Sequence, residues 1–223
     1  MKKITPPKTE EELLVRAWNI AGLSLGELAS QLELPTPQNL LRNKGWIGET
    51  LEKALGATAS SKPEPDFQLI GVELKTIPIR KNRQPKETTH VCTVPIINTT
   101  GMLWENSLVK EKLNRVLWIP IEFDENITLE NRKIGAPLLW SPSPSEEAML
   151  KTDWEEFMEL IGQGELEQIT AHLGEVIQIR PKGANSHALS ETIGKNGEVV
   201  RSLPRGFYLR TSFTATLINQ HYL

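Results

Sequence analysis

In the first third of the chain, apolar residues recur every three or four positions, which is the spacing of amphipathic helices. The pattern predicts helices over Leu13–Ile20 and Leu25–Leu32. A proline-rich break at Pro35–Pro37 then restarts a helix, with Thr36 as its N-cap and Pro37 at its first position. Capping-box pairs precede the first two helices: Thr9 with Glu12, and Ser24 with Glu27.

The next helix is predicted from an apolar stripe at four-residue spacing, formed by Ile47, Leu51 and Leu55. Gly56 is suited to end this helix in a left-handed conformation. Glu52 lies on the same helix, at the edge of the stripe. A loop rich in Ala, Ser and Pro follows over residues 57–65.

After this loop the pattern changes, and short runs rich in β-branched and aromatic residues predict strands. These runs are Phe67–Ile70, Val72–Ile79, Thr88–Ile96, Val116–Phe123, Val176–Arg180 and Phe207–Thr211. Further helices are predicted over Ser145–Ile161, His187–Ile193 and Ser212–Tyr222. A hinge of alternating Ser and Pro at residues 141–144 precedes the first of these helices. The mixture of helices and strands predicts an α/β fold with a mixed sheet flanked by helices.

Composition is consistent with one folded domain over residues 1–223, divided into two lobes. Hydrophobic residues make up 39% of the chain, and no run approaches the roughly 18 apolar residues of a membrane span. The first ten residues lack the apolar core of a secretory signal. A single cysteine, Cys92, excludes an internal disulfide framework and a multi-cysteine zinc site. We therefore expect a soluble, cytoplasmic protein with no membrane partner.

The net charge of −3 hides an uneven distribution along the chain. Residues 121–175 hold 3 basic and 13 acidic side chains, a net charge of −10. Residues 1–120 carry +3 and residues 176–223 carry +4. The two ends could jointly present a positive surface to nucleic acid. Equally, the acidic segment could be no more than a solvated helical surface, and the two interpretations are compatible.

A candidate catalytic group lies around the strand predicted over Val72–Ile79. Glu73 and Lys75 are two residues apart, so both side chains project from one face of the strand, roughly 7 Å apart along it. Asp66 precedes Glu73 by seven residues and can fold back toward it. Two carboxylates beside a lysine suit phosphodiester cleavage, with Asp66 and Glu73 sharing a Mg²⁺ ion and Lys75 addressing the attacking water.

A Glu-x-Lys tripeptide alone is a weak signal in a chain with 25 Glu and 15 Lys. The context strengthens it, because Asp66 is one of only three Asp and follows Pro65 directly. A half-exposed strand with a surface ion pair would explain the same alternation. The four histidines show no metal-ligand spacing, and no nucleotide-binding or serine-hydrolase signature is present.

The arrangement Pro-Asp…Glu-x-Lys resembles the active-site motif of the PD-(D/E)xK nuclease superfamily. Longer blocks of sequence resemble the MutH family of mismatch-repair endonucleases, and they span nearly the whole chain. The blocks are Asn43–Gly48, Gly56–Phe67, Gly71–Pro78, Arg115–Pro120 and Leu203–Leu209. The resemblance implies a restriction endonuclease-like fold, a two-lobed clamp with a DNA-binding cleft. It places catalysis mainly within residues 1–120 and sequence reading mainly within 121–223.

The resemblance further implies Mg²⁺-dependent nicking of the unmethylated strand of hemimethylated GATC, 5′ to the G, leaving a 5′-phosphate. Mn²⁺ or Ca²⁺ would substitute for Mg²⁺ in binding. MutL would activate the enzyme, MutS would act indirectly, and the protein would be a monomer. Asp66, Glu73 and Lys75 would be catalytic, and Glu52 would be an additional carboxylate at the metal.

The resemblance also implies a set of DNA-contacting residues. These are Lys44, Lys112, Arg180, Pro181, Lys182 and Tyr208, with His90 at a position where the family allows phenylalanine. Arginine is the usual bidentate partner of guanine, which suits Arg180 for sequence reading. Tyr208 matches the position that senses adenine methylation, although a strand tyrosine packed on the last helix is the simpler interpretation. His90 puts a base-wedging role for an apolar side chain in doubt.

Two other functions stay open at this point. A restriction-type enzyme would cut both strands of the same tetranucleotide without a partner, but such enzymes often dimerise or carry two sites. A non-catalytic DNA-binding module could keep the nuclease fold. The retention of Glu52, Asp66, Glu73 and Lys75 together argues against the second alternative.

Overall fold

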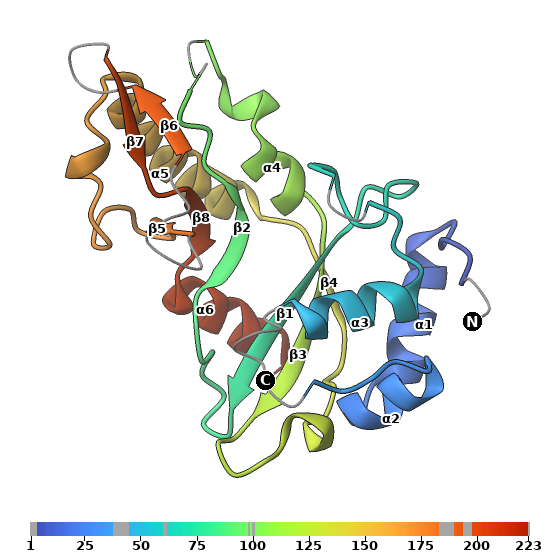
Figure 1. The fold of residues 1–223 in the computed structure, drawn as a ribbon. Coiled ribbons are helices and arrows are strands. Elements are labelled where there is room, and N and C mark those ends of the chain that lie inside the picture. Colours follow the sequence, from blue (N-terminus) through green and yellow to red (C-terminus); the bar gives the residue numbers. More distant parts are fainter. Residues whose placement is uncertain are drawn as a thin grey trace. The chain divides into compact units, whose positions relative to one another are not determined.

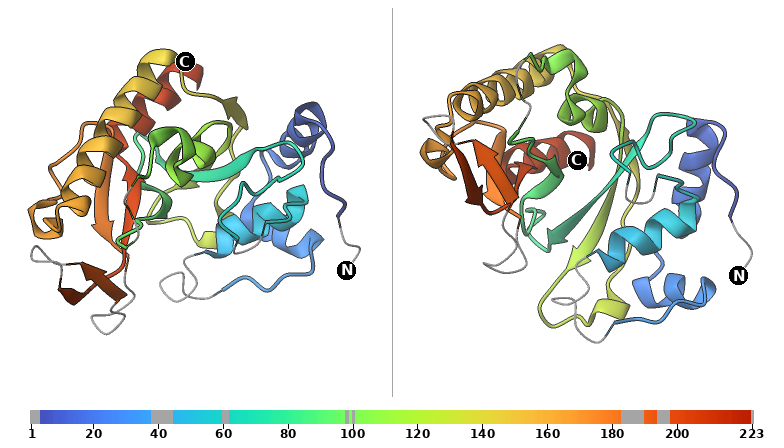
Figure 2. Two further views of the ribbon diagram at one scale, coloured as in Figure 1. Left: turned by 90° about the horizontal axis from the view of Figure 1, so that it is seen from above. Right: turned by 45° about the horizontal axis from the view of Figure 1, so that its top comes forward.

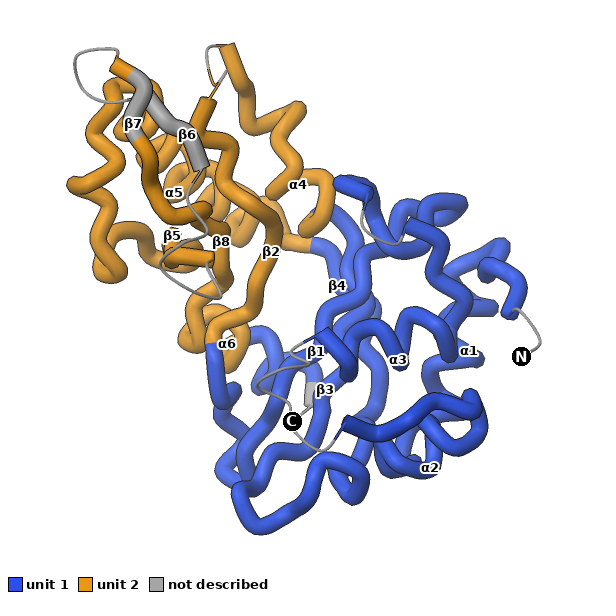
Figure 3. Tube along the Cα trace, viewed as in Figure 1, with its two compact units in different colours: residues 1–87, 114–141, 217–223 blue, residues 88–113, 142–216 orange. Residues whose placement is uncertain are grey.

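The computed structural model describes residues 4–37, 45–59, 62–97, 99, 101–182, 190–193 and 198–222. Helices and strands are interspersed along the chain, which confirms the predicted mixed α/β class (Figure 1). The chain divides into two compact units (Figure 3). Unit 1 comprises residues 1–87, 114–141 and 217–223, and unit 2 comprises residues 88–113 and 142–216. The units are thus interleaved along the sequence, whereas the division of roles between lobes stays a prediction.

Unit 1 is built on a three-stranded sheet with the order β1-β3-β4. Its strands are β1 (Glu73–Arg80), β3 (Val116–Phe123) and β4 (Leu138–Trp140). β1 and β3 are parallel, whereas β3 and β4 are antiparallel. The helices of this unit are α1 (Glu10–Ile20), α2 (Leu25–Gln31), α3 (Trp46–Leu55) and the short 3-10 helix η3 (Leu129–Asn131).

The three α-helices of unit 1 gather on one side of β1 and β3 (Figures 1 and 2). Leu13 on α1 and Leu51 on α3 are fully buried there, in one cluster with Leu74 and Leu117 of the sheet. Because successive strand residues point to opposite faces, burial of Leu74 turns Glu73 and Lys75 to the other face of β1.

Unit 2 contains a three-stranded antiparallel sheet with the order β2-β8-β5. Its strands are β2 (Thr89–Thr93), β8 (Arg205–Leu209) and β5 (Ile177–Pro181), and a separate hairpin joins β6 (Ser190–Ile193) to β7 (Val199–Ser202). Its helices are α4 (Leu108–Leu113), α5 (Pro144–Gly162), η2 (Trp104–Asn106) and η4 (Leu166–Gln168). The last helix, α6 (Thr211–Tyr222), begins in unit 2, and its end belongs to unit 1.

Helix α5 is the long amphipathic helix that the sequence predicts, and it packs on the sheet of unit 2. Phe157 on α5 meets Phe207 on β8 with ring centroids 6.3 Å apart. Its opposite side exposes acidic residues, among them Glu155, Glu156 and Glu159, as expected of a solvated helical surface. Within the described part of the chain, no helix is long and apolar enough to cross a membrane.

Three secondary-structure predictions are wrong. Phe67–Ile70 is a turn, not a strand, because the backbone of Phe67 bonds back to Val72 and closes it. The predicted helix His187–Ile193 is a strand where it is described, since Ser190–Ile193 pairs with β7. Pro37 lies outside any helix, and residues 38–44, which would continue that helix, lie outside the described residues.

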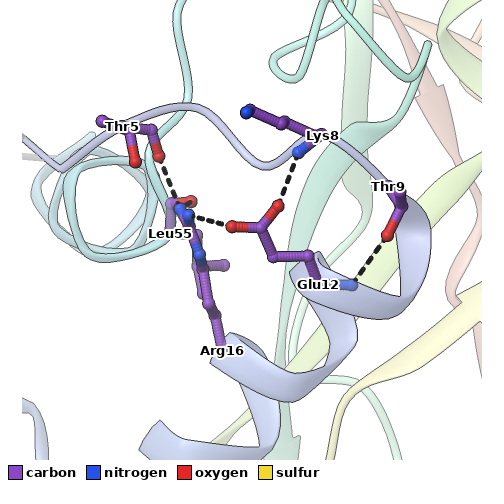
Figure 4. Close-up of polar contacts among 6 residues, drawn as sticks. All are labelled: Thr5, Lys8, Thr9, Glu12, Arg16 and Leu55. Carbon is purple, nitrogen blue, oxygen red and sulfur yellow. Dashed lines mark hydrogen bonds and ion pairs between the residues drawn. The ribbon is translucent and has the colours of Figure 1, made fainter.

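The C-terminus of α3 is tied to the N-terminal segment through Arg16. Its Nη1 donates to the backbone carbonyls of Thr5 (2.6 Å) and Leu55 (3.0 Å), and its Nη2 pairs with Glu12 at 2.6 Å (Figure 4). Gly56 ends the helix in the left-handed conformation, with φ at +86°. A Cβ on Gly56 would lie 2.6 Å from the Thr5 carbonyl and 2.9 Å from Arg16 Nη1.

We expect Gly56→Ala to lower the free energy of unfolding by about 2–3 kcal/mol, because it adds a steric clash to left-handed strain. Gly22→Ala is the matched control, since Gly22 has φ at +84° but nothing within 4 Å of its Cβ position. It should cost only about 1 kcal/mol. Urea denaturation followed by circular dichroism measures both variants, and equal losses would contradict the role given to the Arg16 contacts.

Candidate active site and nucleic-acid interface

The first group of candidate residues lies at the start of β1. The Glu73 backbone N–H donates to the carbonyl of Arg115 at 2.9 Å, which aligns β1 with the start of β3. Lys75 Nζ lies 2.6 Å from Glu73 Oε1, and the two side chains are only 11% and 4% exposed. Because both side chains are largely buried, the alternative interpretation of this pair as a surface ion pair is wrong. Burying such a pair costs desolvation free energy.

Asp66 reaches the same strand through the turn over Phe67–Ile70. Its Oδ2 accepts a hydrogen bond from the backbone N–H of Leu74 at 2.9 Å, and the residue is 9% exposed. The tight turn closed by Phe67 and Val72 brings this carboxylate back to β1. The structure therefore brings Asp66 to the strand that carries Glu73 and Lys75, as the sequence predicts.

Glu52 supplies a third carboxylate from α3. Burial raises the pKa of Glu52 to about 7, and the negative charges of Asp66, Glu49 and Glu73 add to the rise, whereas Lys75 lowers it. The pKa of Glu52 therefore responds to the charges of the other three predicted catalytic residues. Glu49, one helical turn before Glu52, is an acidic neighbour that the sequence analysis missed, although its three-residue spacing from Glu52 could have indicated it.

The side chains of this group have the donor atoms that a Mg²⁺ ion would need. Within the described residues, no three His, Cys, Asp or Glu side chains already form a metal-binding group. Lys75 pairs with Glu73, and Leu74 engages Asp66. The donors are nevertheless hard carboxylate oxygens, which Mg²⁺ prefers. Three carboxylates beside one lysine also leave an excess of negative charge that a divalent cation would neutralise, so these residues fit Mg²⁺.

Two further lysines were assigned to the DNA from the resemblance. Lys112 lies on α4 in unit 2, whereas the carboxylates belong to unit 1. Lys44 lies outside the described residues. The roles of both lysines stay predictions.

The second group of candidate residues lies on the sheet of unit 2. Arg180 and Lys182 are two residues apart at the end of β5, and both are exposed. Arg180 Nη1 donates to Thr88 Oγ1 at 2.9 Å, and Lys182 Nζ donates to Thr93 Oγ1 at 3.0 Å. Pro181, between them, is exposed and ends the strand. The sequence analysis gave no role to Thr88 or Thr93.

His90 and Tyr208 face each other across β2 and β8. Their ring centroids lie 5.1 Å apart in an edge-to-face arrangement, and Arg180 lies 5.8 Å from the centre of the Tyr208 ring. Burial raises the pKa of the Tyr208 hydroxyl. Gly206 leaves room for both rings, because a Cβ there would lie 3.0 Å from Tyr208 and 3.1 Å from His90. The structure thus gathers Arg180, Lys182, His90 and Tyr208 on one sheet.

The C-terminal region holds three further arginines, Arg201, Arg205 and Arg210, whose charge could suit contacts with DNA phosphates. The guanidinium of Arg210 donates to the backbone carbonyls of Ala171, Leu173 and Gly174, so its contacts are those of a structural residue. Arg205 is half-buried, and burial lowers its pKa. Arg201 is exposed on β7. No contact of these side chains indicates a phosphate site.

The chain is similar to known DNA repair proteins along nearly all of its length. A family model described as "DNA mismatch repair enzyme MutH" matches residues 55–153. The DNA mismatch repair protein MutH of Klebsiella pneumoniae (strain 342) is 55% identical over 219 residues, which cover 98% of this chain and 95% of that protein. The protein of the same name from Haemophilus influenzae (strain PittGG) is 56% identical, with 96% of each chain covered. The one from Escherichia coli (strain K12) is 53% identical, with 99% and 96% covered.

Proposed function

Because this chain belongs to the MutH family of DNA mismatch repair enzymes, whose fold is restriction endonuclease-like, we propose that it is a sequence- and methylation-specific DNA endonuclease. It nicks the unmethylated strand of hemimethylated GATC, 5′ to the G, and leaves a 5′-phosphate. It works as a cytoplasmic monomer that clamps double-stranded DNA, is activated by MutL and depends indirectly on MutS. The observation that carries the proposal is the group formed by the largely buried Asp66, Glu73 and Lys75 around the start of β1, with the half-buried Glu52 of α3 near them.

In the proposed mechanism, Asp66, Glu73 and Glu52 would hold Mg²⁺. The ion would supply a Lewis acid that lowers the pKa of a water molecule and offsets charge on the scissile phosphate. The Leu74 N–H fixes one oxygen of Asp66, so this carboxylate is oriented before DNA arrives. Lys75 Nζ lies 2.6 Å from Glu73 Oε1. In the proposal it would orient the attacking water and stabilise negative charge that develops on the phosphate.

A plasmid assay separates this function from that of a restriction-type enzyme. With Mg²⁺ and a plasmid that carries one hemimethylated GATC site, we expect slow conversion of the supercoiled form to the nicked circle. The MutL protein of the same organism should accelerate this conversion. A single catalytic group favours a nick over a double-strand break. Rapid appearance of linear plasmid without MutL would contradict the proposal.

Arg180→Ala tests whether Arg180 recognises the bases of the GATC site. We expect it to weaken binding to a GATC duplex by about 1–3 kcal/mol and to weaken binding to a scrambled duplex less, because a guanidinium that bonds a base edge carries sequence information. Fluorescence anisotropy at fixed salt measures both affinities. Arg201→Ala is the control, expected to change both affinities by the same factor. Equal losses for Arg180→Ala would instead indicate a phosphate contact.

A further inference from the structure

Two cationic side chains cross the central strand of the sheet in unit 2. Arg180 and Lys182 leave β5 on one edge of the sheet, and both end on the side of β2 at the other edge. There Arg180 Nη1 donates to Thr88 Oγ1, and Lys182 Nζ donates to Thr93 Oγ1. The partners are 92 and 89 residues apart in sequence, so each bond joins distant parts of the chain across β8.

The surface of β8 lies between the two edge strands. Gly206 lies opposite both Arg180 and Thr93 in the strand register, and the Tyr208 and His90 rings lie 3.0 and 3.1 Å from where its Cβ would be. The next residue on the same face is Tyr208, and the guanidinium of Arg180 lies 5.8 Å from the centre of its ring. Arg180 is therefore held by an aromatic ring along its path and by a hydroxyl at its end.

Such restraint matters for a side chain that must read a base. Exposed arginine and lysine side chains have many rotamers, and fixing one rotamer upon binding costs conformational entropy. A side chain that is already held in one rotamer loses less conformational entropy when it binds DNA. The guanidinium has five N–H donors, so the bond from Nη1 to Thr88 leaves donors for a bidentate contact with guanine.

We propose that Thr88 and Thr93 are positioning residues for sequence reading, which set the rotamers of Arg180 and Lys182 before DNA binds. The inference rests on the proposed function, since it assigns these two cations to the DNA. Thr88 acts through Arg180, and Thr93 acts through Lys182. Their effect falls on the preference for GATC over other sequences, more than on overall affinity for DNA.

Thr88→Val removes the hydroxyl but keeps the shape of the side chain. We expect it to lower the ratio of GATC to scrambled-duplex affinity roughly 3- to 10-fold, the effect of one net hydrogen bond. Thr93→Val should have a similar effect through Lys182. Thr88→Ser keeps the hydroxyl and should retain most of the preference. Thr152→Val, on the exposed side of α5, is the matched control and should leave the ratio unchanged.

A double-mutant cycle gives the decisive result. In an Arg180→Ala background, Thr88→Val should cause no further loss of preference, because its effect passes through Arg180. The Lys182→Ala and Thr93→Val pair should behave in the same way. Additive losses, or an equal loss of affinity for both duplexes, would overturn the inference while leaving the proposed function intact. A wild-type protein without preference for GATC would overturn both.

Discussion

Replacing Asp66 with asparagine is expected to lower the rate of GATC nicking by roughly 10²- to 10³-fold, the typical effect of removing one preorganised charge from an active site. Asparagine keeps an oxygen that can accept the hydrogen bond from Leu74, so the turn before β1 should survive. It loses the negative charge that the proposed Mg²⁺ site requires. Single-turnover nicking of a hemimethylated duplex, followed on a denaturing gel, measures this effect.

Asp124→Asn is the matched control for this experiment. Asp124 belongs to the same unit and forms an ion pair with the exposed Lys81. It follows Phe123, which pairs with Arg80 at the end of β1, whereas Glu73 lies at the start of that strand. Replacement of Asp124 should leave nicking within a factor of about two, since surface ion pairs contribute little. Binding of Asp66→Asn to a GATC duplex in Ca²⁺ should remain measurable. Unchanged nicking by Asp66→Asn would remove the metal-site hypothesis, and the protein would then be better described as a non-catalytic DNA-binding module.

Replacing Asp153 with alanine is expected to lower the free energy of unfolding by about 3–5 kcal/mol. This carboxylate is 4% exposed on α5, and it accepts hydrogen bonds from the backbone N–H groups of Glu175, Val176 and Ile177 at 2.7–3.0 Å. Alanine would leave these donors without an acceptor in the interior. Because the bonds fix the entry into β5, the same change should also disturb the strand that carries Arg180.

Thermal denaturation measures the predicted loss as a fall in Tm of roughly 10 °C for a chain of this size. Asp153→Asn keeps the shape and one carbonyl oxygen, so its Tm should lie between those of wild type and Asp153→Ala. A Tm for Asp153→Ala within about 2 °C of wild type would show that these backbone donors find other acceptors.

Two of the three aspartates, Asp66 and Asp153, illustrate how far sequence reasoning reaches. Asp66 was identified because it follows a proline and precedes a Glu-x-Lys strand, and the structure places it beside that strand. Asp153 belongs to a segment read only as acidic surface, yet its side chain is buried. The difference lies in its partners at residues 175–177, because their proximity depends on tertiary packing.

Secondary structure was predictable where a local signal was complete. Ser24 and Glu27 form the predicted capping box at the start of α2, and Gly56 ends α3 as predicted. Phe67–Ile70 was wrongly predicted as a strand because a short apolar run has no periodicity that distinguishes a strand from a turn. Ser190–Ile193 was read as a helix because its partner strand, β7, was not recognised.

The candidate catalytic group was easier to predict from the sequence than the contacts of Arg180 and Lys182 on the sheet of unit 2. Strand alternation alone places Glu73 and Lys75 on one side of β1, whatever the rest of the fold does. By contrast, Arg180 and Thr88 meet only because β8 lies between β5 and β2 in the sheet. Strand order and register are not encoded within any short window, so the threonine partners of the two cations could not be inferred from the sequence.

The central claim is that Glu52, Asp66 and Glu73 form the active site of an endonuclease that distinguishes the methylated from the unmethylated strand. The most direct measurement uses one duplex with a single GATC site, differently labelled strands, and adenine methylation on neither, one or both strands. With Mg²⁺ and MutL, we expect cleavage 5′ to the G in unmethylated strands only, and no cleavage of the fully methylated duplex. Cleavage of the methylated strand at a comparable rate, or cleavage that persists without a divalent cation, would contradict the account.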